Sequence, residues 1–157
     1  MKDFILISIR SHHCQKIITG EKNFEFRKKI PNFNSSQYDK NIIVYSSGKD
    51  KAIIGAFKVQ TIFSLPFAAL MNKLNIAVAD WDSFKEYYQE SKTCHAVEIV
   101  ECVNFKESIS LSKLKAIDTS FSPPQNYRFI TRQNAAIYKA IHLAIYGECV
   151  FDHESTL

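Results

Sequence analysis

The amino-acid sequence predicts an α+β domain built around a small β-barrel or strongly curved sheet, with flanking helices and a C-terminal helix. Three observations carry this prediction. Several short segments have the composition and alternation of strands, segments with helical spacing interrupt them, and the clearest helical pattern lies near the C-terminus. The chain of 157 residues, 46% hydrophobic and 23% charged, is long enough for a single globular domain covering residues 1–157.

The N-terminal part predicts a strand, a short helix and a second strand. Residues 4–10 (FILISIR) have isoleucines at alternate positions, which is typical of a strand with two different faces. A helix is expected at about 12–19, with Ser11 as its N-cap and Gly20 as its C-terminal stop. Residues 22–30 (KNFEFRKKI) alternate again and predict the second strand.

Two further strands are expected before the middle of the chain. Residues 30–41 have the composition of a turn or loop, with Pro, Asn, Ser and Asp. Strands are predicted at 42–48 (IIVYSSG) and 52–63 (AIIGAFKVQTIF), joined by a hairpin-like loop. Gly55 lies inside the second of these strands, which predicts a bulge or a close backbone approach.

The middle of the chain predicts two helices and a long strand. Helical spacing of apolar residues covers 65–74 and 80–90, with Ser64 and Asp80 as candidate caps. Residues 94–105 (CHAVEIVECVNF) read as a strand. Glu101 interrupts its alternation, so we expect a bend or bulge there.

The C-terminal part predicts a loop followed by a helix. Residues 120–127 (SFSPPQNY) have loop composition. The segment 131–147 has a clear stripe of isoleucines, with Thr131 as a candidate N-cap and Gly147 as the stop. We expect the tail, 148–157, to be frayed.

Composition excludes several classes of protein. No apolar run approaches the roughly 20 residues that a membrane-spanning helix requires. The N-terminus has no small-residue cleavage site, so we expect a cytoplasmic protein without a membrane partner. The four cysteines, at positions 14, 94, 102 and 149, lack paired spacing, which favours buried free thiols. Without a C-x-x-C pair we predict no metal site, and we expect no cofactor.

Charge is unevenly distributed along the chain. Residues 1–60 contain eleven Lys or Arg and five Asp or Glu, a balance of +6, whereas residues 61–157 contain nine and eleven, a balance of −2. The excess of cations in the first part indicates an anionic partner, although an unevenly charged solvated surface would look the same.

The segment GEKNFEFRKKI, Gly20 to Ile30, contains the polar residues with the sharpest spacing. Glu25 and Arg27 are two residues apart on a predicted strand, so their side chains lie on one face, and Lys22 precedes them. An arginine fork can bind a phosphate or a base edge, and a carboxylate can accept hydrogen bonds from an exocyclic amine. The alternative is an ion pair on a solvated strand face.

Other candidate binding residues lie at strand ends and in the last loop. Ser8 and Arg10 share a face at the end of the first strand. Hydroxyl groups at Tyr45, Ser46 and Ser47 could bind a base or a phosphate, or the serines could simply begin a turn. The segment PPQNYR offers an amide, a ring and a cation at Gln125, Tyr127 and Arg128, although the ring could instead anchor the loop in the core. His12 and His13 are expected to be exposed.

The segments ILISIR, IITGEKNFEFRKKI, VYSSG, IIGAFKV and PPQNYRFI, in this order, resemble the ASCH family of the PUA-like superfamily. The resemblance covers residues 4–130. It implies a PUA-like barrel whose cleft is lined by the first helix, the G-x-K strand and the opposite loops, and it implies RNA binding. Some members instead hydrolyse amides of modified cytidine with a lysine followed three residues later by a threonine nucleophile. Lys22 matches that lysine, but Glu25 stands in place of the threonine, so the activity is not carried over.

We therefore predict a nucleic-acid-binding module that accepts RNA, another single-stranded nucleic acid or a nucleotide, as a regulator of transcription or translation. A small amidohydrolase acting on a modified nucleoside and an adaptor with a protein partner are the alternatives. No catalytic residue is predicted. The predicted ligand-binding residues are Ser8, Arg10, Lys22, Glu25, Arg27, Tyr45, Ser46, Ser47, Gln125, Tyr127 and Arg128.

Overall fold

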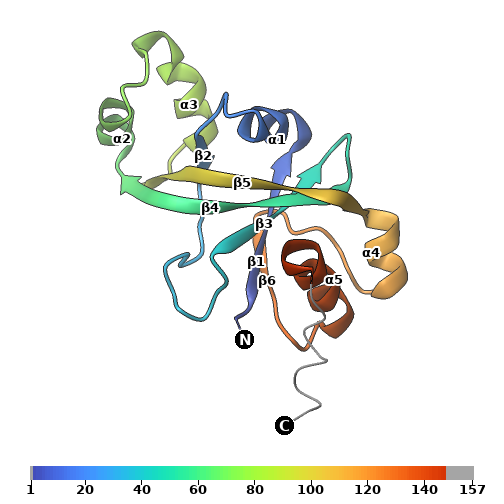
Figure 1. Ribbon diagram of the computed structural model, residues 1–157. Helices are drawn as coiled ribbons and strands as arrows, with labels where there is room; N and C mark the ends of the chain where they lie inside the picture. The colour runs from blue at the N-terminus through green and yellow to red at the C-terminus, as the bar shows by residue number, and fades with distance from the viewer. Residues whose placement is uncertain (1, 148–157) are drawn as a thin grey trace.

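A computed structural model describes residues 2–147 as six strands in one sheet and five α-helices (Figure 1). The spatial order of the strands is β2-β5-β4-β3-β1-β6, with β1 and β3 parallel and the other pairs antiparallel. The sheet curls into a half-barrel, which confirms the α+β prediction. The elements are β1 (Phe4–Arg10), α1 (Ser11–Ile18), β2 (Phe24–Arg27), β3 (Asn41–Ser47), β4 (Ala52–Leu65), α2 (Phe67–Lys73), a 3-10 turn (Val78–Asp80), α3 (Trp81–Tyr88), β5 (Cys94–Ser110), α4 (Leu111–Ile117), β6 (Tyr127–Ile130) and α5 (Ala135–Tyr146).

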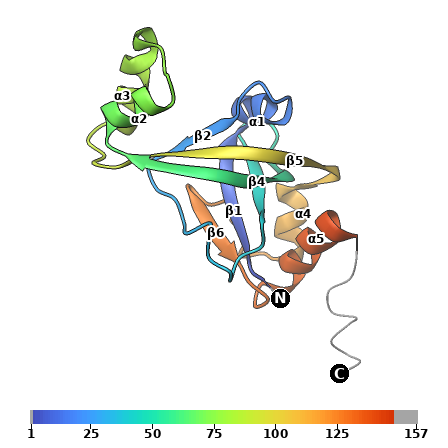
Figure 2. The ribbon, with the colours of Figure 1, turned by 60° about the vertical axis from the view of Figure 1, so that its left-hand side comes forward.

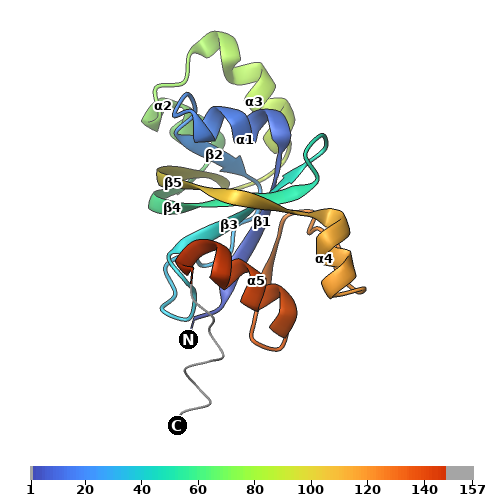
Figure 3. The ribbon, with the colours of Figure 1, turned by 45° about the vertical axis from the view of Figure 1, so that its right-hand side comes forward.

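The alternation predicted for β1 separates the two sides of the sheet. Phe4 and Leu6 are buried with residues of α4 and α5 on one side. Ile5, Ile7 and Ile9 are buried on the other side with Cys14 and Ile17 of α1. Figure 3 shows α5 and α1 on opposite sides of the strands. The period of two along β1 therefore produces two cores, one under each of these helices.

The strands β4 and β5 form a long ribbon that extends beyond the rest of the sheet. Gly55 lies where the β4–β5 register shifts, and a Cβ added there would come 2.1 Å from the carbonyl oxygen of Val103. Glu101 has a φ of +51°, and the register shifts again around it. Both predicted irregularities are thus confirmed. Figure 2 shows α2 and α3 at the far end of the ribbon, where they pack over a third cluster of buried residues.

The serine and threonine N-caps predicted from the sequence are wrong. α1 begins at Ser11 itself, whose hydroxyl donates to the carbonyl of Ser47. Ser64 lies in β4, and its hydroxyl bonds to the ring of His95. α5 begins at Ala135 rather than just after Thr131. Each of these hydroxyls bonds to a group in a neighbouring strand or turn instead of an N–H group at the start of a helix. Only the tertiary structure determines which partner it takes.

Other boundaries differ in length or were not predicted. β2 covers only Phe24–Arg27, whereas the sequence predicted 22–30. α4 was not predicted, and the first residue of β6, Tyr127, was expected in a loop. Gly20 and Gly147 have φ values of +77° and +68° beside the ends of α1 and α5, as expected for helix stops.

The remaining predictions concern cysteines, the tail and membranes. Cys14 and Cys94 are buried as expected, but Cys102 is exposed. Position 149 and the predicted tail, 148–157, lie outside the described residues. Within residues 2–147, no helix is long and apolar enough to cross a membrane.

Candidate nucleic-acid interface

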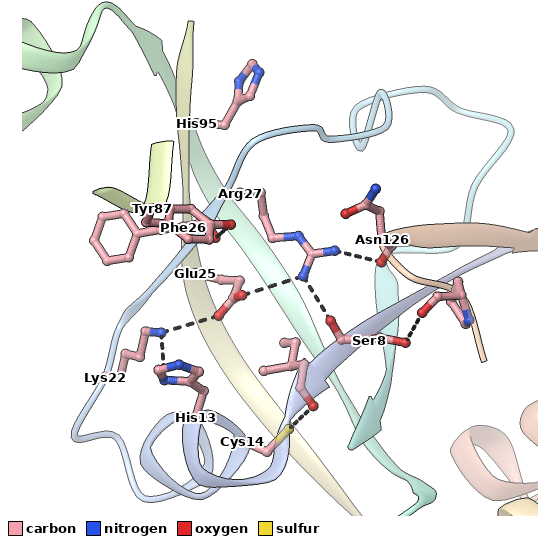
Figure 4. A network of polar contacts seen from close by, with 12 residues as sticks. Ser8, His13, Cys14, Lys22, Glu25, Phe26, Arg27, Tyr87, His95 and Asn126 are labelled. Carbon is pink, nitrogen blue, oxygen red and sulfur yellow. Dashed lines mark hydrogen bonds and ion pairs between the residues drawn. The ribbon is translucent and has the colours of Figure 1, made fainter. Parts of the chain in front are cut away.

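The edge strand β2 and the turn before it bring three predicted site residues into one chain of ion pairs. Lys22 Nζ lies 3.4 Å from Glu25 Oε2, and Arg27 Nη1 lies 3.6 Å from Glu25 Oε1 (Figure 4). Glu25 is 6% exposed and Arg27 is 9% exposed. A carboxylate can be buried at this depth because it has a cation on each side.

Arg27 connects β2 to a distant part of the sheet. Its Nη1 donates to the carbonyl of Ser8 in β1 at 2.9 Å, and its Nη2 donates to the carbonyl of Asn126, just before β6, at 2.6 Å. The sequence suggested that this fork would be offered to a ligand. In the structure it instead joins β2 to the opposite edge region of the curled sheet, so Arg27 has a positioning role.

Ser8 lies beside this connection, but its hydroxyl is directed to the chain. Ser8 Oγ donates to the carbonyl of Pro124 at 2.6 Å. The backbone N–H of Ser8 donates to the carbonyl of Asn126 at 3.2 Å. Together with Arg27, these bonds fix the loop that precedes β6 against the end of β1.

His13, which the sequence analysis placed on the surface, is half-buried and completes the group. Its Nδ1 lies 3.5 Å from Lys22 Nζ. An ammonium group can only donate, so Nδ1 accepts and the ring proton is on Nε2. Burial lowers the pKa of His13 to about 4, and the cations Lys22, Lys16 and Arg10 add to this effect. The imidazole is therefore neutral at pH 7. His13, Lys22, Glu25 and Arg27 are called the β2 network below.

Lys22 is the member of the ion-pair chain that reaches solvent. Its side chain is 20% exposed, against 8% for Glu25 and 10% for Arg27. Its ammonium also lies 5.8 Å from the ring centroid of Phe26. Arg10 and Lys16 are exposed near His13 and add positive charge around this point. The arrangement offers an anion one accessible ammonium with further cations nearby.

Three predicted residues of β3 do not face the β2 network. Tyr45 is 2% exposed and belongs to the core on the α5 side of the sheet. Ser46 is fully buried, and its hydroxyl bonds to Ser11 and Asp50. Ser47 is half-buried and gives its carbonyl to Ser11. The Ser46 hydroxyl and the Ser47 carbonyl thus bind around the turn after β3, which is the alternative weighed for the two serines from the sequence.

The predicted residues just before β6 and within it lie on different sides of the sheet. Tyr127 is half-buried and packs against the core under α1, as an anchor of the loop. Arg128 lies over the ring of Phe121, 5.3 Å from its centroid, and so belongs to the other side. Gln125 is exposed. Of the predicted residues, the structure thus brings together Ser8, Lys22, Glu25 and Arg27, and His13 joins them.

Two hollows lie along α1 and the β4–β5 ribbon. One has a volume of about 20 Å³ and is lined by apolar residues that include Cys14 and Gly55. The other is open, about 430 Å³, and its lining includes Gln15, Asp50 and Lys106. Neither hollow is lined by Lys22, Glu25 or Arg27. The β2 network is therefore a polar seam with an accessible rim at Lys22.

The fold and the seam define a class: an α+β domain with a curled six-stranded sheet and a buried ion-pair chain on its first edge strand.

No protein-family model matches the sequence. The chain is 22% identical over 129 residues to an ASCH domain-containing ribonuclease of Zymomonas mobilis, covering 82% of this chain and 84% of the relative. The crystal structure of an ASCH protein from Zymomonas mobilis matches with a TM-score of 0.68 and 21% identity, over 84% of this chain and 90% of that one.

A more distant match has the same type of fold. The N-terminal domain of McrB from Staphylothermus marinus has a TM-score of 0.53 at 10% identity, over 87% of this chain and 93% of that one. The expected resemblance is confirmed: the chain is similar to an ASCH domain-containing protein in sequence and shares the fold of the ASCH crystal structures.

Proposed function

We propose that this domain binds single-stranded RNA at the β2 network, with Lys22 contacting a backbone phosphate. The observation that carries the proposal is the chain from Lys22 through Glu25 to Arg27, because it holds an accessible ammonium in a fixed place with a buried carboxylate. Phosphate is the anion that nucleic-acid-binding proteins engage with such cations.

The charges around Lys22 favour an anionic ligand over a cationic one. Lys22 and Arg27 outnumber Glu25 within the network, and the His13 ring is uncharged at pH 7 because its pKa is lowered to about 4. Arg10 and Lys16 lie close enough to contribute to that lowering. The most accessible charge is positive, since Glu25 is 6% exposed. That a relative of similar length is named a ribonuclease supports RNA as the polyanion.

The test is the salt dependence of binding to a fluorescein-labelled single-stranded RNA, measured by fluorescence anisotropy. Three or four phosphate contacts give a slope of log affinity against log salt of about −2 to −3. Lys22→Met should weaken binding and make the slope shallower by about 0.7, the contribution of one phosphate on a single strand.

Lys115→Met is the matched control, because Lys115 is exposed on α4 at the other end of the molecule (Figure 1). It should leave affinity and slope at the wild-type values. Binding that does not respond to salt, or an equal loss in the two variants, would contradict a phosphate contact at Lys22.

Cleavage of the bound RNA is a second candidate, favoured by the name of the relative and by the contact between Lys22 and His13. In such a reaction the ribose 2′-hydroxyl loses its proton to a base and attacks the adjacent phosphorus. The bond to the 5′-oxygen breaks, leaving a 2′,3′-cyclic phosphate and a 5′-hydroxyl. The Nδ1 atom of His13 becomes free to accept this proton when Lys22 moves its ammonium from Nδ1 to the phosphate, whose charge it then stabilises. The leaving 5′-oxygen takes its proton from water.

Cleavage can be separated from binding with a single chemical change in the RNA. A strand with 2′-deoxyribose throughout should bind but stay intact, whereas the ribose strand should give cyclic phosphate ends. His13→Ala should stop product formation with little loss of affinity. An intact ribose strand after prolonged incubation with wild-type protein would exclude this candidate.

The two alternatives from the sequence stay predictions. For an amidohydrolase, Glu25 would have to act as a base or nucleophile, yet it is 6% exposed and ion-paired on both sides. A protein partner remains testable by a pull-down that survives nuclease treatment.

A further inference from the structure

Tyr87 of α3 is an exposed aromatic side chain that is attached to the strand of the β2 network. Its hydroxyl donates to the carbonyl of Phe26 at 2.9 Å, while the residue as a whole is 42% exposed. Phe26 lies between Glu25 and Arg27, and β2 has its only ladder partner, within residues 2–147, on the β5 side. The tyrosine thus caps the open edge of β2 while the residue stays partly in solvent.

The ring is held by contacts on several sides. Tyr88 lies at 5.0 Å between centroids in an edge arrangement, with an interplanar angle of 71°. Burial raises the pKa of Tyr87, and the nearby Arg27 guanidinium acts in the opposite direction. A ring anchored through its hydroxyl loses little conformational entropy when a ligand stacks on it.

Two ammonium groups lie near Phe26 and Tyr87, and one of them is the accessible cation of the network. Lys22 Nζ is 5.8 Å from the ring centroid of Phe26, the residue whose carbonyl Tyr87 binds. Lys28 is exposed just after β2, with its ammonium 5.3 Å from the Tyr87 ring centroid. Figure 4 shows Tyr87 of α3 next to Phe26 of β2, with Glu25 on the same strand and Lys22 in the turn before it. The Tyr87 ring therefore has the Lys28 ammonium at its face, and the Lys22 ammonium lies beside the ring of Phe26, the residue that Tyr87 binds.

We propose that Tyr87 forms a base-stacking subsite for an unpaired nucleotide, whose flanking phosphates are bound by Lys22 and Lys28. This inference rests on the proposed RNA binding and gives it a substrate class. A base can stack on a side chain only if it is free of its neighbours, so the ligand is single-stranded and unstacked RNA. The α2–α3 segment then takes part in recognition, because it supplies the ring.

The test compares Tyr87→Leu with Tyr87→Phe. The leucine variant loses the ring, whereas the phenylalanine variant keeps the ring and loses only the hydroxyl anchor. A stack of roughly 1–3 kcal/mol predicts a loss of about 5- to 150-fold in affinity for Tyr87→Leu. Tyr87→Phe should stay close to wild type. An RNA containing 2-aminopurine should show quenching with wild type and Tyr87→Phe but not with Tyr87→Leu.

Tyr146→Leu is the matched control, because Tyr146 is 46% exposed, has a hydrogen-bonded hydroxyl and lies on α5 across the sheet. It should bind as wild type does. An oligomer of abasic ribose phosphate should bind wild type and Tyr87→Leu equally, since it has no base to stack. Circular dichroism checks that each variant is folded.

The outcomes separate this subsite from the proposed function. If Lys22→Met loses affinity while Tyr87→Leu binds as tightly as wild type, the phosphate site stands and the stacking subsite is wrong. Equal losses in Tyr87→Leu and Tyr87→Phe would assign the effect to the hydroxyl anchor and overturn stacking. No binding of any RNA by wild-type protein would overturn both.

Discussion

His13 shows how one residue takes its properties from its neighbours. An exposed histidine has a pKa near 6.5, but burial and the cations around this ring bring it down to about 4. The three lysine and arginine side chains that act on it come from α1, from the turn before β2 and from the end of β1. Its neutrality at pH 7 is therefore a product of the fold.

This shift predicts how stability responds to acid. The folded-state pKa of His13 lies below the unfolded value, so protonation favours unfolding. The stability that comes from keeping the His13 ring neutral is complete above about pH 6.5 and is lost as the pH falls towards 4. After allowance for solvent screening we expect it to amount to about 1 kcal/mol. His13→Gln should lose less stability than wild type between pH 7 and pH 4.5, as measured by urea unfolding. Identical losses in the two proteins would contradict the shift.

At the scale of elements, the β4–β5 ribbon depends on a close backbone contact at Gly55. A methyl group there would meet the Val103 carbonyl at 2.1 Å, and backbone cannot yield as a flexible side chain can. We expect Gly55→Ala to lower the free energy of unfolding by about 3 kcal/mol. Chemical denaturation provides the measurement.

Gly147→Ala is a useful comparison for Gly55→Ala. Position 147 has a φ of +68° and open space around its Cβ, so only the left-handed backbone opposes the substitution. That costs about 1 kcal/mol. If the two variants were equally stable, crowding against the Val103 carbonyl would not be the cause of the stability lost in Gly55→Ala.

The elements that the sequence predicted are those whose pattern repeats several times. β1 and β4 are long enough for alternation to appear, and Glu101 is visible because it breaks such a pattern. β6 has four residues, Tyr127–Ile130, as many as β2, but it directly follows a segment of loop composition, whereas alternation continues on both sides of β2. α4 has seven residues, and its signal is Ser110, which accepts a hydrogen bond from the N–H of Lys113. That cap could have been recognised before the structure.

The candidate site was predictable to the extent that it lies on one strand. Glu25 and Arg27 share a face because strands alternate, whatever packs against them. His13 and Tyr87 were missed because they reach β2 from helices, and the docking of a helix onto an edge strand leaves no local pattern. Tyr45 was misassigned since its hydroxyl suggested a ligand, whereas its ring is 2% exposed in the core.

At the scale of the molecule, Arg27 holds the two ends of the curled sheet together. Removing its guanidinium would leave the carbonyls of Ser8 and Asn126 without these donors and would leave Glu25 buried beside Lys22 alone. We expect Arg27→Met to lower the free energy of unfolding by about 3–5 kcal/mol, the range for breaking a buried pair.

Two further variants identify the cause of that loss. Adding Glu25→Gln to Arg27→Met removes the stranded charge and should recover part of the stability in urea unfolding. Arg128→Met removes an arginine that lies over a ring on the other side of the sheet, and should cost about 1 kcal/mol or less. No recovery in the double variant would show that the carbonyl contacts, rather than the ion pair, dominate.

The strand order has a consequence for how the chain reaches this structure. β1 pairs with β6, so that Phe4 lies opposite Ile130, and β2 pairs with β5, so that Phe24 lies opposite Glu98. Contacts between such distant parts of a chain slow folding, which for topologies of this kind takes on the order of milliseconds to seconds. During translation the sheet cannot be completed until residue 130 has left the ribosome, and until then the outer edge of β1 remains open to pairing with other chains.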